Sequence, residues 1–167
     1  MDEVLGELLS VNTTQAFQFF FTGLKSTDGV RDQDDELLYV AGILAHYAQT
    51  SCLKEGSIAC PKDLFDTRAF FTWEVVGNDA EILEIGGTQV ILLAGFFRDQ
   101  MARRHDVEWY DQFGRSLYTR ASQHARDVRK REFFGRFAPN LPQWTITCST
   151  LRKNLYESRY DHLLLKP

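Results

Sequence analysis

The sequence predicts an all-α protein, a single-domain bundle of about six or seven helices. Apolar residues recur at helical spacing along most of the chain, and capping residues, glycines or prolines separate these segments. The 167 residues are 44% hydrophobic and 25% charged, which is typical of a globular protein that can bury a core. No stretch resembles a linker or a repeat, so we expect one domain over residues 1–167, with irregular termini at 1–11 and 162–167.

Three helices are expected in the first half of the chain. The first begins near Thr14 and is followed by a loop at residues 25–31. Asp32 is a suitable N-cap for the second, which carries acidic residues in its first turn, where the helix dipole favours them, and ends near Ser51. Pro61 suits the first turn of a third helix.

A central helix is expected from Ala80 to Phe97. It is apolar on nearly all sides, which only a helix surrounded by others tolerates in water. The pair Gly86-Gly87 lies within it, and Gly114 lies within the next helix, which Asp106 should cap. Because glycine is unfavourable inside a helix, these positions predict close contact with neighbouring helices.

Two further helical segments are expected before the C-terminus. Pro139-Asn140 should end the first, which covers residues 128–137, and Pro142 should open the second. The β-branched run at residues 145–150 leaves a strand as an alternative there.

The charge is distributed unevenly. Residues 1–97 hold 5 Lys and Arg against 15 Asp and Glu, whereas residues 98–167 hold 14 against 8. One interpretation is an anion or nucleic-acid surface formed by Arg98, Arg103, Arg104, Arg115, Arg126, Arg129, Lys130 and Arg131. The other is that the two halves neutralise each other within the fold or across a dimer. Acidic residues interleave the basic ones, so we favour the second interpretation and expect no useful nucleic-acid affinity.

Aromatic residues offer a candidate pocket. Nine of the 13 phenylalanines stand next to another phenylalanine, which buries a wide sector of a helix. A pocket between the helices at 80–97 and 106–121 would be lined by Phe96, Phe97, Trp109, Tyr110 and Tyr118. An aromatic-rich core made of the same residues is the favoured interpretation.

No motif indicates catalysis. The four histidines and three cysteines lack metal-ligand spacing, and neither a nucleophile elbow nor a phosphate-binding or dinucleotide-binding loop occurs. We therefore expect no catalytic residue, no metal and no cofactor, and an enzyme is not favoured. The acidic N-terminus does not resemble a signal peptide, no stretch suits a membrane span, and three cysteines leave one unpaired, so a cytoplasmic location is expected.

Two stretches carry a family resemblance. One runs from Leu83 to Phe97 and the other from Val107 to Tyr118, and the matching positions are Gly95-Phe96-Phe97, Tyr110, Gly114 and Tyr118. They resemble a bacterial all-helical family without an assigned activity, whose pattern is Leu-Gly-Asp, Gly-Phe-Phe, Tyr-Tyr and Gly-x-x-x-Tyr. Gly87 stands where that pattern has Asp, and Trp109 where it has the first Tyr. The resemblance implies an all-helical fold, and any function of the family's Asp would be lost here.

Three functional hypotheses follow. The first is a non-enzymatic helical domain that binds another protein, or a second copy of itself as a homodimer, through an aromatic or charged face. The second is an anion or nucleic-acid binder that uses residues 98–136. The third is a small-molecule-binding protein or enzyme with the pocket described above.

Overall fold

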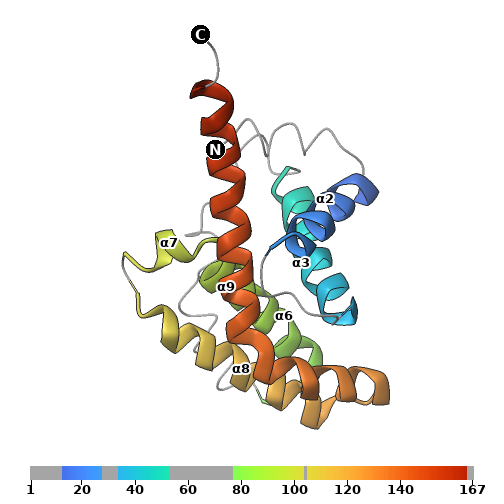
Figure 1. Ribbon diagram of the computed structural model, residues 1–167. Helices are drawn as coiled ribbons and strands as arrows, with labels where there is room; N and C mark the ends of the chain where they lie inside the picture. The colour runs from blue at the N-terminus through green and yellow to red at the C-terminus, as the bar shows by residue number, and fades with distance from the viewer. Residues whose placement is uncertain (1–12, 28–33, 53–76, 104, 165–167) are drawn as a thin grey trace.

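The computed structural model describes residues 13–27, 34–52, 77–103 and 105–164 (Figure 1). Within these ranges every regular element is a helix, which confirms the all-α prediction. The elements are α2 (Thr13–Lys25), α3 (Asp34–Cys52), α6 (Ala80–Val90), the π-helix η1 (Ile91–Phe96), α7 (Arg98–Met101), α8 (Val107–His124) and α9 (Val128–Leu164). The predicted third helix and residues 1–11 lie outside the described residues.

Helix η1 is the buried centre that the sequence predicts for the whole of residues 80–97, whereas α6 is buried along one side only, with Glu81 and Ile85 exposed. Asp79 caps α6, because its Oδ1 accepts hydrogen bonds from the backbone N–H groups of Glu81 and Ile82. All residues at 90–97 are buried. The difference from prediction is the π-helix, in which the Phe97 N–H donates to the Leu92 carbonyl five residues before it.

Helix α8 packs on α6 and α9 along one stripe of its surface. Asp106 is its N-cap, as predicted. A Cβ added at Gly114 would lie 2.6 Å from both Val90 Cγ1 and Leu141 Cδ2, and one added at Gly87 would lie 2.5 Å from the Tyr118 ring. The predicted close helix contacts are therefore confirmed at Gly87 and Gly114.

The prediction that Pro139 ends one helix and Pro142 opens another was wrong. Helix α9 is continuous over 37 residues and contains both prolines. Each proline removes one backbone hydrogen bond, but the helix on either side is held by tertiary contacts. Trp144 Nε1 donates to buried Glu36 of α3 over 2.6 Å. Figure 1 shows α9 bending between its first turns and its long run toward the C-terminus, and prolines are a common cause of such bends.

The strand alternative at residues 145–150 was also wrong, since this run is part of α9. Its threonine hydroxyls are satisfied within the helix, because Thr147 and Thr150 donate to the carbonyls of Gln143 and Ile146. Helix α9 also extends to Leu164, so residues 162–164, which were expected to be irregular, are helical.

Candidate functional site

The five residues predicted to line a pocket fall into two groups. Phe96, Phe97, Tyr110 and Tyr118 are buried and belong to the hydrophobic core. The ring of Tyr118 fills the space over Gly87, so the two helices touch there. Trp109 differs, because it is 53% exposed.

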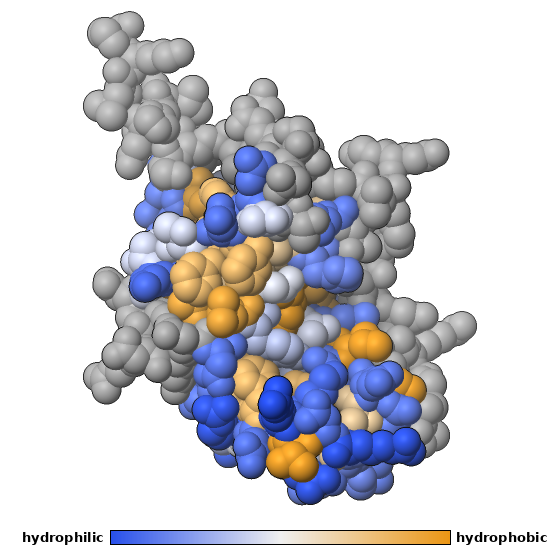
Figure 2. Space-filling model, turned by 90° about the vertical axis from the view of Figure 1, so that its right-hand side faces the viewer, coloured by the Kyte–Doolittle hydropathy of each residue, from blue (hydrophilic) through white to orange (hydrophobic). Residues whose placement is uncertain are grey.

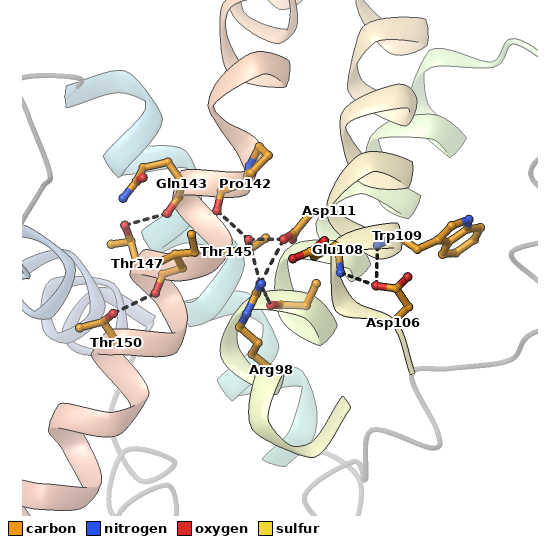
Figure 3. A network of polar contacts seen from close by, with 12 residues as sticks. Arg98, Asp106, Glu108, Trp109, Asp111, Pro142, Gln143, Thr145, Thr147 and Thr150 are labelled. Carbon is orange, nitrogen blue, oxygen red and sulfur yellow. Dashed lines mark hydrogen bonds and ion pairs between the residues drawn. The ribbon is translucent and has the colours of Figure 1, made fainter. Parts of the chain in front are cut away.

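Trp109 lies outside the buried stripe of α8. The stripe includes Tyr110, Gly114, Leu117 and Ala121, which recur every three or four residues, and also Tyr118. Because neighbours on a helix point about 100° apart, Trp109 is turned away from this stripe. Its ring stacks on the Phe113 ring instead, with centroids 5.1 Å apart and planes inclined by 10°. Figure 3 shows its side chain directed away from the polar network beside α8.

The exposed side of α8 combines this aromatic pair with polar and charged residues. We define the outer α8 face as Glu108, Trp109, Gln112, Phe113, Arg115 and Ser116, of which all but the half-buried Phe113 are exposed. Figure 1 shows α8 along the lower edge of the molecule. Within the part of the chain that the structure describes, neither Glu108 nor Arg115 has an ion-pair partner.

A buried network fixes the other side of α8 (Figure 3). Asp111 accepts a hydrogen bond from Arg98 over 3.2 Å and another from the Thr145 hydroxyl over 2.8 Å. Arg98 also donates to the Ala94 carbonyl in η1 over 2.9 Å. Burial raises the pKa of Asp111, although Thr145 and Arg98 oppose the shift. The network ties η1, α8 and α9 together.

A polar cavity of about 590 Å³ lies where the N-terminus of α6 meets the turn between α8 and α9. It is lined by Asn78, Asp79, Ala80, Glu81, Glu84, His124, Ala125, Arg126, Asp127, Lys130 and Phe134. The cavity lies away from the predicted aromatic lining, and sequence reasoning missed it. Its residues are far apart along the chain, and several of them look like ordinary helix caps.

A chain of hydrogen bonds leads from this cavity into the core. Glu84 Oε2 accepts from Lys130 Nζ over 2.8 Å, and its Oε1 accepts from the Tyr39 hydroxyl over 3.2 Å. The Tyr118 hydroxyl lies 3.0 Å from that of Tyr39. Since the proton of Tyr39 goes to Glu84, Tyr118 is the donor in this contact. Burial raises the pKa of both tyrosines, so both hydroxyls stay protonated. The direction of each hydrogen bond in this series is therefore fixed.

A smaller apolar groove of about 330 Å³ lies between α2 and α3. It is lined by Thr14, Phe17, Gly42, Ala45, His46 and Gln49. Figure 2 shows hydrophobic side chains gathered on the side of the molecule that carries these two helices. The groove offers apolar contact area, but its lining has no acidic side chain and no lysine or arginine, whereas the outer α8 face has Glu108 and Arg115.

The predicted arginine surface is divided by the fold. Arg103, Arg115, Arg126 and Arg129 are exposed, and Arg104 lies outside the described residues. Arg98 is held by Asp111, and Arg131 donates twice to the Ala125 carbonyl.

Two ion pairs, Lys130–Glu84 and Arg136–Asp35, join the basic half of the chain to the acidic half. Part of the charge asymmetry is thus neutralised within the fold.

The buried cysteine is a packing residue. Cys148 is fully buried, and burial raises the pKa of its thiol to about 12. It therefore acts as a small hydrophobe, as its place on an apolar helix predicts. Across the described ranges, no group of three or more histidine, cysteine and acidic side chains could hold a metal ion.

Comparison with known proteins found no matching family model, curated protein or solved structure. The family resemblance noted in the sequence stays a prediction. In the described part of the chain, no helix is long and apolar enough to cross a membrane.

Proposed function

We propose that this protein is a non-enzymatic helical interaction domain whose outer α8 face binds a polypeptide partner. The exposed Trp109 ring is the observation that carries the proposal. Tryptophan is highly buried on average in globular proteins, and interface hot spots are enriched in tryptophan, tyrosine and arginine. Here the ring is already held in place by its stack on Phe113.

The surroundings of this ring support the proposal. Glu108, Gln112 and Arg115 lie around the aromatic pair, and protein interfaces commonly place aromatic residues at the centre and polar residues at the rim. The backbone beneath is fixed by Gly114, whose close contacts with Val90 and Leu141 lock α8 in position. A rigid surface loses less conformational entropy when a partner binds.

The polar residues behind α8 suit a structural role. Among the described residues, no buried side-chain nitrogen or oxygen lacks a hydrogen-bond partner. Asp111 is satisfied by Arg98 and Thr145, and Tyr118 by Tyr39. These groups stabilise the inner side of α8 and leave its outer side as the surface that can be used for binding.

Photo-crosslinking tests the proposal. Benzoylphenylalanine introduced at Gln112, at the centre of the outer α8 face, should form a covalent adduct with a polypeptide in cells that express the chain. The same amino acid at Gln123, which is exposed on the same helix, is the control. The adduct at Gln112 should disappear when Trp109→Ala is added. Equal adducts at both positions, or adducts that survive Trp109→Ala, would contradict the proposal.

The polar cavity supports a second candidate function, the binding of a small organic cation. Four carboxylates and two cationic side chains line it, so its field favours positive charge. Lys130 already responds to this field, because the hydrogen bond that it donates to Glu84 and the charges of Glu84, Glu81 and Asp127 raise its pKa. The volume lies within the range of about 300–1,000 Å³ that is usual for ligand sites.

Titration with putrescine tests this second candidate. Binding measured by calorimetry should weaken in Glu81→Gln, which removes one carboxylate of the cavity. Glu157→Gln, which removes one exposed charge away from the cavity and from the outer α8 face, is the matched control and should bind like the wild type. No heat of binding to the wild type, or the same loss in both variants, would exclude the cavity as a cation site.

A further inference from the structure

We propose that the partner of the outer α8 face is a second copy of this chain, packed antiparallel about a two-fold axis at Gln112. This inference rests on the proposed function, since it names the partner of the same surface. Charged and aromatic residues around and along α8 carry it.

Around the helix, the charged and the aromatic residues lie on opposite sides of Gln112. With about 100° per residue, Glu108 lies about 40° and Arg115 about 60° to one side of Gln112. Trp109 and Ser116 lie about 60° and 40° to the other side. The charged residues therefore form one edge of the face, and the indole forms the other.

Along the helix, the acidic and the basic residue lie on opposite sides of Gln112 at similar distances. At 1.5 Å per residue, Glu108 lies about 6 Å before Gln112 and Arg115 about 4.5 Å after it. A two-fold axis at Gln112 reverses the direction of the second helix but keeps each edge on its own side. Glu108 then comes within one residue step of Arg115 of the partner subunit. Symmetry repeats this contact, which gives two ion pairs.

The aromatic edge is self-complementary as well. The same operation places Trp109 opposite Ser116 of the partner subunit, again within one residue step. Serine is small, so the indole can lie over that position, with Phe113 supporting it from behind. Burial of an aromatic ring that is now 53% exposed then drives association.

The charge pattern also selects the orientation. A parallel pair, with its two-fold axis along the helices, would carry each edge to the opposite side, so the charged edge of one α8 would face the aromatic edge of the other. Only the antiparallel pair brings opposite charges together. A contact through one helix face is small, so we expect a dissociation constant on the order of micromolar.

Charge reversal tests the pairing. In sedimentation equilibrium, the wild type should rise from the 19.3 kDa monomer toward the dimer as its concentration increases. Glu108→Arg and Arg115→Glu should each weaken association about tenfold or more, because each places like charges together twice. The double variant should recover to within about threefold of the wild type, since its pairs are opposite again. A double variant as weak as the singles would overturn the arrangement.

Disulfide trapping tests the axis itself. Gln112→Cys should give a disulfide-linked dimer on mild oxidation, because both copies of this residue lie at the axis. Gln123→Cys is the control, since its two copies would lie about 33 Å apart. The wild-type chain supplies the background from its own cysteines. Equal trapping at both positions would overturn the proposal.

The two proposals fail in different ways. If the wild type stays monomeric at about 200 μM, well above the micromolar dissociation constant expected for so small a contact, the second copy is excluded. An adduct between benzoylphenylalanine at Gln112 and a different polypeptide would then still support the interaction domain. If no adduct of any kind depends on Trp109, the interaction domain is wrong as well.

Discussion

The two faces of α8 use similar residues for different purposes. Tyr110 and Trp109 are consecutive aromatic residues, yet the first is 7% exposed and the second 53%. The inner face is defined by Gly114, which lets Val90 and Leu141 come within contact distance of the backbone. The outer face has no such neighbour within the described residues. Aromatic content therefore does not identify the buried side of this helix, whereas the position of its glycine does.

The largest expected effect lies in the core that α8 helps to enclose. Phe96→Ala removes a ring that is 5% exposed and that meets the Phe20 ring edge-on. We expect a loss of about 3–5 kcal/mol in the free energy of unfolding, because a large cavity remains. Ile146→Ala, at a side chain that is half exposed on α9, is the control and should change little. Urea denaturation measures both, and a loss below about 1 kcal/mol for Phe96→Ala would contradict the buried centre.

A smaller effect is expected at the glycine that marks the inner face. Gly114→Ala should lower the free energy of unfolding by about 1–3 kcal/mol, since Val90 and Leu141 must move. Gly135→Ala is the matched control, because its added Cβ meets only Ser122 Oγ at 4.0 Å. That variant should gain about 0.5–1 kcal/mol from helix propensity. A higher melting temperature for Gly114→Ala would contradict the close contact.

The ionisation of Asp111 provides a pH-dependent test of the inner face. Its raised pKa means that the folded state keeps the proton to a higher pH than the unfolded state does. Folding then takes up a proton, so this group's contribution falls as the pH rises above about 3.9, the ordinary pKa of Asp. The free energy of unfolding of the wild type minus that of Asp111→Asn should therefore decrease from acidic to neutral pH. An increase would mean that the ion pair with Arg98 outweighs burial.

No measurable effect is expected when nucleic acid is added, although several arginine residues lie on and around α8. Arg98 and Arg131 are engaged within the fold, and acidic residues interleave the others. Labelled DNA and RNA at about 150 mM salt should show no saturable binding tighter than about 1 μM. Tighter binding would favour the anion-binding hypothesis over a polypeptide partner.

The sequence predicted the elements whose signals are local. The Asp106 cap, the apolar run at 80–97 and the glycines at Gly87 and Gly114 are each visible in a few consecutive residues. The continuity of α9 was missed because its support comes from far away. Glu36, which holds Trp144, is 108 residues distant in the chain, and nothing near Pro139 indicates it.

The candidate site was only partly predictable for a similar reason. The sequence named Trp109 and Arg115, but it did not show that both lie on one exposed face. Which sector of a helix is buried depends on how many neighbours it has, and an aromatic residue fits either side. The polar cavity forms only because the turn between α8 and α9 packs near the start of α6. These segments are distant in the sequence, so no local pattern predicts the cavity.

The difference between Trp109 and Tyr110 tests the account most directly. Trp109→Ala and Tyr110→Ala are unfolded in urea at one low protein concentration, where association does not contribute. We predict that Trp109→Ala stays within about 0.5 kcal/mol of the wild type, as exposed substitutions do. Tyr110→Ala should lose at least about 2 kcal/mol, as buried aromatic residues do. Equal losses would show that both rings stabilise the fold, and the outer α8 face would then be a part of the core.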